Sequence, residues 1–443
     1  MANSNITLGS VTLRDYQAAA AIRNVELLQK FGVAADTSDT GTGKTYSALG
    51  SLHMMLQANT CKHALVITPK AVVTAFRRVS EAMKVPVLDV LNVEKLKAGN
   101  TPWMKKQGKS FEWHAPANTL LIVDEAHRFG GETSDNGKVL ALAKAYKYAV
   151  LMLSATLAEN PLRMRAPGFL MGLHNYQIGA FRYWCLQRGC YRSPFVYGKL
   201  EFPTGPSRLP HLQRLHEEMA PFCTRVRIAD IPDFPECDTQ PMLYDLNKEY
   251  TQQINDIYEE MDEEIANPPA GANPLTVKLR ARQRVEIIKV PLLFDLVMDL
   301  LEENRSVVVF FNFRDALFGL EKMLAEAGWS CAKIIGRQGL ERQVNIDLFQ
   351  NDFVRIALVM AEAGGVGLGL HDVGGQYPRT ALLTPSHNAV VMKQCLGRIH
   401  RDSAKSKALQ RFVLAAGTVE EDVYKKLLGK HANIDLINDG DLF

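Results

Sequence analysis

The amino-acid sequence predicts an α/β protein with two tandem parallel-sheet lobes and a mostly helical insertion between them. Three observations lead to this prediction. Short apolar runs alternate with helical stretches over the first 160 or so residues, a second series of the same kind begins near residue 296, and a glycine-rich loop opens a helix in the first series. Strands that alternate with helices form parallel sheets, and their functional loops follow the carboxyl ends of the strands.

Length and composition are those of an ordinary globular protein with two or three domains. The chain has 443 residues, of which 47% are hydrophobic and 22% charged, and its net charge of +3 is too small to argue for a polyanionic partner by itself. The first residues lack the basic start and apolar core of a secretory signal, and no apolar run is long enough to span a bilayer. Seven scattered cysteines fit a reducing compartment. We expect a protein of the cytoplasm or associated with the nucleoid, and no membrane partner.

The first lobe is expected over residues 1–162. Helical patterns cover residues 15–31 and 44–57. Three apolar runs have the pattern of buried strands that end in polar or small residues: 63–69, 119–127 and 148–156.

The second lobe is expected over residues 296–443, and an insertion or brace over residues 163–295. Strand patterns in the second lobe cover residues 306–313, 354–361, 379–384 and 409–417. The insertion begins as a basic, aromatic-rich stretch and continues as an acidic helical stretch over residues 244–265, followed by a breaker rich in proline, glycine and asparagine.

A phosphate-binding loop is predicted at "DTSDTGTGKTYSAL". Backbone N–H groups at the start of a helix form a nest for phosphate, Lys44 would reach the β- and γ-phosphates, and the Thr45 hydroxyl would bind Mg²⁺. Ser38 stands where the strict pattern has glycine. A glycine-rich turn with a buried or solvated lysine is the weaker alternative. The predicted loop residues are Thr40, Gly41, Thr42, Gly43, Lys44 and Thr45.

Paired acids end the apolar run in "LIVDEAH". Asp124 at the strand tip can hold Mg²⁺, mostly through water because Mg²⁺ dehydrates reluctantly, and Glu125 can polarise an attacking water. Acids in a solvated loop are the alternative, which the phosphate loop upstream disfavours. The two segments together predict a nucleoside triphosphatase.

The stretch "QCLGRIHR", residues 394–401, predicts a second anion contact. Gln394, Arg398 and Arg401 are spaced by four and three residues, which on a helix places all three on one face. Two neighbouring arginines repel each other, so we expect an anion opposite them. A γ-phosphate held by the other lobe would suit, since an arginine finger accelerates hydrolysis about 10³–10⁵-fold. A surface helix with solvated arginines is the alternative.

Eight segments occur in an order that identifies a resemblance: "LRDYQ" (13–17), "DTGTGKT" (39–45), "ITPKAVV" (67–73), "DEAH" (124–127), "SATLAENP" (154–161), "VVVFFNFR" (307–314), "AEAGGVGLGL" (361–370) and "QCLGRIHR" (394–401). The chain resembles the superfamily 2 helicases over both lobes. Within that superfamily it is most similar to the Snf-type double-stranded DNA translocases, through "TPKAVVTAFRRVSE", "AGGVGLGLHDV" and "GTVEEDVYKKLL". The resemblance implies two RecA-like lobes and ATP as the nucleotide.

The resemblance also implies roles at the ATP site. Lys44 and Thr45 match the phosphate and magnesium residues, and Asp124 and Glu125 match the metal and water residues. Gln17 matches the adenine-reading glutamine, with Arg14 in the same motif, and Gln394, Arg398 and Arg401 match the last motif.

Further matches concern coupling and nucleic acid. Ser154 and Thr156 match the motif that couples hydrolysis to lobe movement, and His127 is better interpreted as a coupling residue than as a metal ligand. Gly367 lies in the loop that joins the nucleotide and nucleic-acid sites. The positions where the family touches the nucleic-acid backbone are Pro69, Lys70, Asn312, Arg314 and Gly365.

Two segments depart from the Snf-type pattern. The phosphate loop reads "TGTGKT" rather than "MGLGKT", and "GRIHR" carries a glycine common in other branches. Obvious chromatin-reading appendages are not recognised in the sequence. This compactness suits a minimal motor encoded by a phage or mobile element and acting in a host cytoplasm.

The stretch 163–214 is the predicted insertion surface for nucleic acid. It carries eight Lys or Arg residues and one acid, Glu201, with interleaved aromatics that suit base stacking or a strand-separating wedge. Half or more of the aromatics are expected in a helical core instead. A zinc site is the disfavoured interpretation of four cysteines whose spacing matches no ribbon or finger: Cys185, Cys190, Cys223 and Cys237.

The expected function is ATP hydrolysis that drives movement along DNA, with remodelling of forked or branched DNA, or strand separation, as the output. Double-stranded or forked DNA is the favoured partner, single-stranded DNA a further one, and RNA less favoured. One alternative is a DExH-type RNA helicase, since no residue pattern tests for the 2′-hydroxyl. Another is a nucleotide-gated clamp with slow turnover. The oligomeric state stays open, and a monomer is compatible with the sequence.

Overall fold

The computed structural model describes residues 6–194, 196–267, 273–336, 340–364, 369–386 and 388–440. The chain divides into two compact units. One comprises Met1–Pro232 together with Gly429–Phe443, and the other comprises Asp233–Leu428. The division falls inside the last helix, α16 (Glu420–Asp439).

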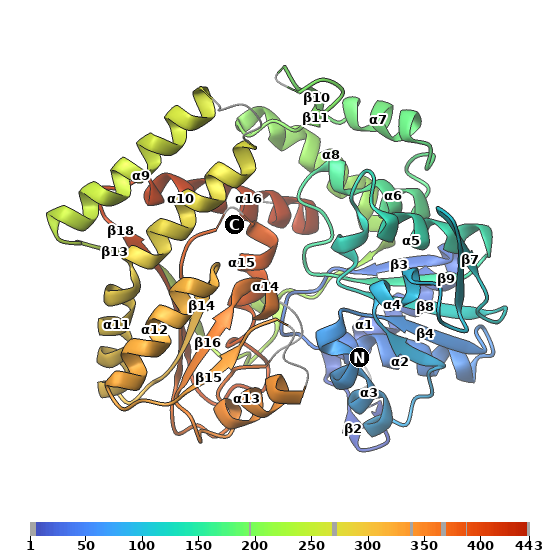
Figure 1. Ribbon diagram of the computed structural model, residues 1–443. Coiled ribbons are helices and arrows are strands. Elements are labelled where there is room, and N and C mark those ends of the chain that lie inside the picture. The colour runs from blue at the N-terminus through green and yellow to red at the C-terminus, as the bar shows by residue number, and fades with distance from the viewer. Residues whose placement is uncertain are drawn as a thin grey trace. The chain divides into compact units, whose positions relative to one another are not determined.

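The first unit is built on a six-stranded sheet in which every neighbouring pair is parallel (Figure 1). Its strands, in spatial order, are β12 (Cys223–Thr224), β3 (Val33–Asp36), β9 (Ala149–Leu153), β8 (Thr119–Asp124), β4 (His63–Ile67) and β5 (Asp89–Leu91). Because the strands are parallel, the residues that follow their carboxyl ends meet at one edge of the sheet.

Helices cover both faces of this sheet. One apolar core lies under α1 (Asp15–Phe31), α2 (Lys44–Gln57) and α3 (Val73–Ala82). The other lies under α4 (Val93–Lys97), α5 (Asp135–Ala145), α6 (Arg165–Leu170), α7 (Ile178–Leu186) and α8 (Leu209–Met219). Successive strand residues alternate between the two cores, as in Leu120 and Leu121. Short hairpins complete the unit: β1–β2 (Thr7–Leu8, Val11–Thr12), β6–β7 (Met104–Gln107, Ser110–Trp113) and β10–β11 (Tyr191–Arg192, Leu200–Glu201).

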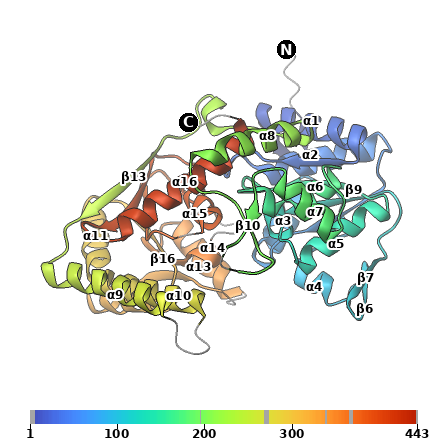
Figure 2. The same ribbon diagram turned by 90° about the horizontal axis from the view of Figure 1, so that it is seen from above.

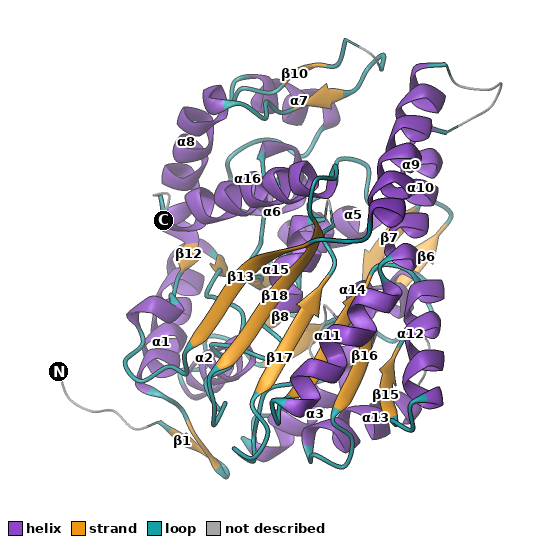
Figure 3. Ribbon diagram, turned by 90° about the vertical axis from the view of Figure 1, so that its left-hand side faces the viewer, coloured by secondary structure: helices purple, strands orange, loops and turns teal. Residues whose placement is uncertain are grey.

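The second unit contains another six-stranded sheet, again with all neighbours parallel (Figure 3). Its spatial order is β13 (Cys237–Tyr244), β18 (Ala408–Ala415), β17 (Arg379–Leu383), β14 (Ser306–Phe311), β16 (Ile356–Met360) and β15 (Cys331–Ile334). The helices within it are α9 (Lys248–Ala266), α10 (Pro274–Ile288), α11 (Val290–Glu302), α12 (Arg314–Glu326), α13 (Leu340–Gln350), α14 (Ala361–Gly364) and α15 (Ala389–Leu396). Figure 2 shows α9 and α10 side by side, and they share a small apolar core.

The predicted fold class is confirmed: the protein is α/β with two RecA-like parallel-sheet lobes. Each of the seven apolar runs predicted as strands forms one, and the helices predicted at 15–31 and 44–57 have those bounds. Within the two six-stranded sheets, five short or edge strands were not predicted, namely β3, β5, β12, β13 and β15, and neither were the strands of the short hairpins. β13 shows the reason, because an edge strand with exposed alternate residues and a proline lacks a continuous apolar run.

The segment 163–295 contributes to both sheets. Residues up to Pro232 are grouped with the first unit, to which they add β12, and the remainder are grouped with the second unit, to which they add β13. The three-part division with boundaries at residues 162 and 295 stays a prediction. None of the helices in the described ranges is long and apolar enough to cross a membrane.

One buried ion pair fixes the end of the second sheet. The Lys289 side chain is fully buried, and its Nζ donates to both Glu420 carboxylate oxygens at 2.9 and 2.8 Å and to the Val413 carbonyl at 2.7 Å. The backbone N–H of Ala415 also donates to Glu420 Oε2 at 2.9 Å. A single cation therefore ties the turn after α10 to the last strand and to the start of α16.

We expect Lys289→Met to destabilise the second unit by about 3–5 kcal/mol, because it leaves the Glu420 carboxylate buried without its cation. The urea concentration at the unfolding midpoint measures the effect. Lys322→Met is the control, since Lys322 is an exposed lysine whose contact with Glu326 is 3.9 Å long, and it should leave the midpoint nearly unchanged. Equal midpoints for the two variants would contradict the prediction.

Candidate nucleotide-binding site

The phosphate loop joins β3 to α2. Gly41 and Gly43 have φ values of 98° and 87°, a left-handed conformation that favours glycine, and Gly43 is the N-cap of α2. Lys44 Nζ donates to the carbonyl oxygens of Ser38 at 2.8 Å and Asp39 at 3.0 Å. The loop thus curls around the lysine that the sequence predicted for the phosphates, and the backbone N–H groups at the start of α2 lie beside it.

Carboxylates surround this lysine. Partial burial lowers the pKa of Lys44, and the negative charges of Asp36, Glu125, Asp39 and Asp124 oppose that shift. Burial raises the pKa of Asp36, whose Oδ1 accepts the backbone N–H of Ser38 at 3.0 Å. A phosphate chain placed here would lie beside one lysine and several carboxylates. A divalent cation would compensate the excess of negative charge.

The predicted metal and water residues lie at the carboxyl end of β8. Asp124 Oδ2 accepts the Thr68 hydroxyl at 2.8 Å, and Oδ1 accepts the Glu125 backbone N–H at 3.0 Å. Burial and the neighbouring Glu125 charge raise the pKa of Asp124 to about 6. Glu125 has φ 52°, an uncommon left-handed conformation for this residue type.

His127 connects the paired acids to the loop after β9. Its Nδ1 lies 3.1 Å from Ser154 Oγ and 3.4 Å from a Glu125 carboxylate oxygen. Burial, together with the positive charges of Arg128 and Arg163, lowers the pKa of His127 to about 3, so the ring is neutral at neutral pH. The structure therefore brings together the residues assigned to coupling, since the Thr156 N–H also donates to Ser154 Oγ at 3.3 Å.

Gln17 contacts the phosphate loop directly. Its Nε2 donates to the Thr42 carbonyl at 3.0 Å, and its Oε1 accepts the Arg14 backbone N–H at 3.1 Å, which closes a capping box at the start of α1. A Cβ added at Gly43 would meet Gln17 Nε2 at 2.4 Å. This glutamine thus braces the loop, and adenine recognition by Gln17 stays a prediction.

The last motif lies in the second unit and differs from its predicted form. Gln394 lies in α15, but the helix ends at Leu396, so the prediction of one helical face for Gln394, Arg398 and Arg401 is wrong. The Arg398 N–H bonds the Cys395 carbonyl in a tight turn, and the Arg398 carbonyl accepts the N–H of Leu370 at 2.9 Å. This turn and the tertiary hydrogen bond from Leu370 replace the next helical turn.

The side chains of this motif are not those of a solvated surface helix. Gln394 and Arg398 are buried. Burial and the charges of Arg401 and Arg379 lower the pKa of His371 to about 4, which indicates that Arg401 lies near the loop after the glycine-rich segment. Gly367 of that segment lies outside the described residues.

The predicted nucleic-acid residues differ in accessibility. Lys70 and Arg314 are exposed, Pro69 is buried as the N-cap of a short 3₁₀ turn, and Gly365 lies outside the described residues. The Asn312 amide donates to Glu286 at 2.8 Å and to Thr384 at 3.0 Å. Contact with nucleic acid stays a prediction for each of these residues.

The oxygen donors at the site fit Mg²⁺. The Thr45 hydroxyl in the first turn of α2 and the Asp124 carboxylate are hard ligands, and Mg²⁺ is usually held by one or two such groups together with phosphates and water. Among the described residues, no cluster of three or more His, Cys, Asp or Glu side chains could hold a metal ion. Cys185 and Cys190 are buried in the first unit, and Cys237 belongs to the second.

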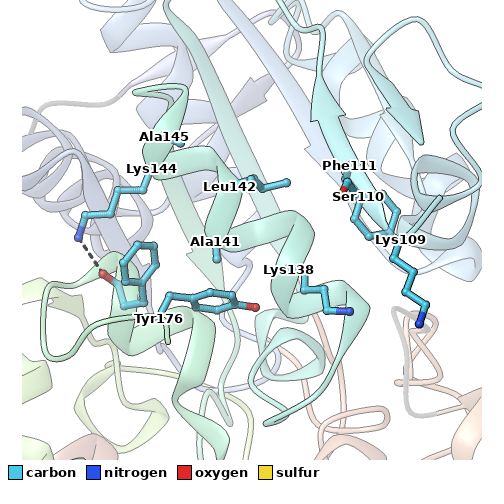
Figure 4. A pocket seen from close by; sticks show the side chains of 10 residues that line it. Lys109, Ser110, Phe111, Lys138, Ala141, Leu142, Lys144, Ala145 and Tyr176 are labelled. Carbon is cyan, nitrogen blue, oxygen red and sulfur yellow. Dashed lines mark hydrogen bonds between the residues drawn. The ribbon is translucent and has the colours of Figure 1, made fainter. Parts of the chain in front are cut away.

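A separate pocket of about 620 Å³ lies between α5 and the β6–β7 hairpin (Figure 4). Its floor is apolar, with Phe111 and Leu142, and Lys109 and Lys138 lie at its margin. Lys144 points instead toward the Phe169 carbonyl, to which it donates at 2.8 Å. None of its lining residues belongs to the motifs above, so it is not part of the nucleotide site.

Three residues at the site were not predicted from the sequence. Asp36 is the last residue of β3, and Thr68 directly follows β4. Both lie at strand ends beside the predicted motifs, and this position could have identified them from the sequence. Arg225 donates to Asp39 Oδ1 at 2.7 Å, and no sequence signal indicated this contact between residues far apart in the chain.

Two family models match the chain. The model described as type III restriction enzyme, res subunit, matches residues 10–159, and the helicase conserved C-terminal domain matches residues 275–403. A mimivirus protein named "Putative ATP-dependent RNA helicase L364" is 30% identical over 466 aligned positions, which cover 98% of this chain and 85% of that protein. The chain therefore belongs to the superfamily 2 helicases and is an ATP hydrolase.

The chain is also similar in sequence to a DNA repair protein, which agrees with the predicted Snf-type resemblance. The mouse DNA repair and recombination protein RAD54B is 30% identical over 165 residues, which cover 37% of this chain and 18% of that protein. Among solved structures, the Sulfolobus solfataricus SWI2/SNF2 ATPase core in complex with dsDNA aligns over 98% of this chain and 95% of that chain, with 17% identity and a TM-score of 0.40. The protein is an ATP-dependent helicase or translocase of superfamily 2.

We expect Lys44→Ala to reduce ATP turnover by at least about 10²-fold, because it removes the cation that the phosphate loop surrounds. Steady-state phosphate release measures the effect. Lys62→Ala is the matched control, an exposed lysine before β4 that should hydrolyse ATP at the unaltered rate. Undiminished turnover in Lys44→Ala would show that the nucleotide is held elsewhere.

Proposed function

We propose that the chain is a DNA translocase that uses ATP and Mg²⁺ to move along duplex DNA and to remodel forked or branched DNA. The observation that carries the proposal is the convergence of the phosphate loop, the paired acids and the His127–Ser154 contact at one edge of the first sheet. That arrangement suits a site whose hydrolysis is transmitted to a neighbouring loop. The similarity to RAD54B, a protein named for DNA repair and recombination, favours DNA as the track.

In the proposed mechanism, Lys44 compensates the charge of the β- and γ-phosphates, and Thr45 and Asp124 hold the metal ion. The ion, when bound, neutralises phosphate charge. Glu125 orients and polarises the attacking water. Arg398 and Arg401, with Gln394, stabilise the charge that develops on the γ-phosphate when the lobes close.

His127 is proposed to report the state of the γ-phosphate. Glu125 and Ser154 both approach Nδ1 of the neutral imidazole, which carries at most one hydrogen, so a change in the position of Glu125 alters the bond between His127 and Ser154. Ser154 also accepts the N–H of Thr156, which continues the path into the loop after β9. Movement of that loop would accompany hydrolysis.

The β10–β11 hairpin is the proposed wedge for strand separation. Much of the basic, aromatic stretch is internal: Phe181 and Trp184 are buried in the core of the first unit. The hairpin differs, because its described residues include exposed aromatic, apolar and basic side chains: Tyr191, Arg192, Val196, Tyr197 and Lys199. Exposed aromatics beside cations suit stacking on bases and contact with phosphates.

An RNA helicase is the second candidate function. The mimivirus relative, which aligns with nearly the whole chain, is named as an RNA helicase. The nucleotide chemistry would be unchanged, and only the track would differ.

We expect duplex or forked DNA to stimulate ATP turnover at least about tenfold, and structured RNA to have little effect, because the proposed translocase closes its lobes on a DNA track. Phosphate release is measured without nucleic acid and with each polymer at fixed salt, with Lys44→Ala as the blank. Stimulation by RNA alone would replace the proposal with the second candidate. No stimulation by any polymer would favour a slow nucleotide-gated clamp.

We expect the double variant Tyr191→Ala, Tyr197→Ala to lower the rate of strand separation on a forked duplex by about tenfold, because it removes two stacking surfaces. Its DNA-stimulated ATP turnover should be nearly unaltered. A fluorophore–quencher fork assay measures separation. Tyr183→Ala is the matched control, an exposed tyrosine on α7 outside the hairpin. Equal loss of separation in both would contradict the wedge.

A further inference from the structure

Arg225, which follows β12, joins two segments that are distant in the sequence. Its Nε and Nη2 donate to the two carboxylate oxygens of Asp439 at 2.7 and 2.8 Å. Its Nη1 donates to the Thr37 carbonyl and to Asp39 Oδ1, both at 2.7 Å. The guanidinium thus holds the end of α16 on one side and the start of the phosphate loop on the other.

The contact of Arg225 with Asp39 is one of several between the segment after β12 and the start of the phosphate loop. The second carboxylate oxygen of Asp39 accepts the Ile228 N–H at 2.9 Å, and the Asp39 N–H donates to the Val226 carbonyl at 3.0 Å. Ser38 Oγ accepts the Val226 N–H at 3.0 Å. Three residues after β12 therefore contact the start of the phosphate loop: Arg225, Val226 and Ile228.

The segment after β12 influences the position of Lys44 through the backbone of the phosphate loop. The carbonyl oxygens of Ser38 and Asp39 are the acceptors of the Lys44 ammonium. Their orientation depends on the same two residues that the Arg225 segment fixes. A shift of Asp39 would therefore move the atoms that place Lys44, without any change in Lys44 itself.

The end of α16 reaches a second loop of the site. Asn438 Nδ2 donates to the Ala155 carbonyl at 2.8 Å, and Ala155 lies between Ser154 and Thr156. Asn438 is buried, and the side chain of Asp439 is 5% exposed. Two successive residues of one helix thus support the phosphate loop, through Arg225, and the proposed coupling loop, directly.

We propose that Arg225 is a positioning residue for ATP, and that it acts only when Asp439 of the last helix holds its fork in place. The inference rests on the proposed nucleotide site and adds to it a dependence on the end of α16. The geometry requires the planar guanidinium, because three nitrogens serve three acceptor groups at once, and an ammonium cannot reproduce that fork.

The test compares ATP affinity in Arg225→Lys and Asp439→Asn, measured by competition of ATP against a fluorescent N-methylanthraniloyl-ATP, without nucleic acid. Each variant should weaken ATP binding about tenfold, the loss expected for one charge-assisted hydrogen bond. The double variant should bind no more weakly than the weaker single one, because both changes break one unit.

Arg208→Lys is the matched control. Arg208 also holds α16, through Asn433 Oδ1 at 2.5 Å, but it donates in addition to the carbonyls of Thr204 and Gly205 rather than to the phosphate loop. It should shift the melting temperature as much as Arg225→Lys does and leave ATP affinity unaltered. Turnover at saturating ATP should be nearly normal in Arg225→Lys, so that the defect falls on KM.

The outcomes separate the two levels of inference. Failure of the unaltered chain to bind ATP would overturn the proposed function and this inference with it. Unaltered ATP affinity in Asp439→Asn, or equal weakening in Arg208→Lys and Arg225→Lys, would overturn the inference alone, since Arg225 would then serve only to dock α16. If Arg225→Lys fails to fold, Asp439→Asn decides, because it keeps the shape of the side chain and removes the charge and one of the two oxygen acceptors of the Arg225 guanidinium.

Discussion

The half-buried ammonium of Lys44 is the constraint around which the first unit is organised. Removing a cation from water is costly unless it is paired, so the loop turns its own carbonyl oxygens inward and carboxylates gather nearby. The left-handed glycines permit that turn, and Gln17 closes it from the side of α1. The same groups that compensate the charge of the lysine are those that we propose to surround the phosphates and a divalent cation, so the contacts that stabilise the fold would also form the site.

The parallel sheet explains why residues that the sequence assigned to one site lie at one edge of the first sheet. Long central strands such as β8 are continuous apolar runs, and each ends in the polar residues that the motifs contain. A predicted strand therefore also predicts that the residues directly after it lie at the carboxyl edge of the sheet. The unpredicted strands are two to four residues long or lie at an edge, as β13 does, so their apolar signal is too weak or too irregular.

The parts that sequence could not give are set by contacts between distant residues. The residue spacing predicted that Arg398 lies on a helix, but α15 ends at Leu396. The Arg398 carbonyl accepts a hydrogen bond from the Leu370 N–H instead. Asn312 was predicted to contact nucleic acid, which stays a prediction, and the sequence did not indicate its hydrogen bonds with Glu286. This buried carboxylate also accepts the backbone N–H groups of Asn312 and Phe313. Local pattern fixes which element a residue belongs to, whereas tertiary hydrogen bonds decide where its polar groups point.

The basic stretch 163–214 shows why a count of positive charges overestimates a nucleic-acid surface. Arg188 is buried and forms two hydrogen bonds with Glu218, and Arg182 is paired with Glu132. Such arginines hold elements together, and their charge is compensated before any phosphate approaches. The β10–β11 hairpin is therefore proposed as the nucleic-acid contact because its side chains are exposed, and not because of the composition of the stretch. For the proposed wedge this arrangement is favourable, because internally paired arginines would make a rigid base for the exposed hairpin that we propose to contact the separating strand.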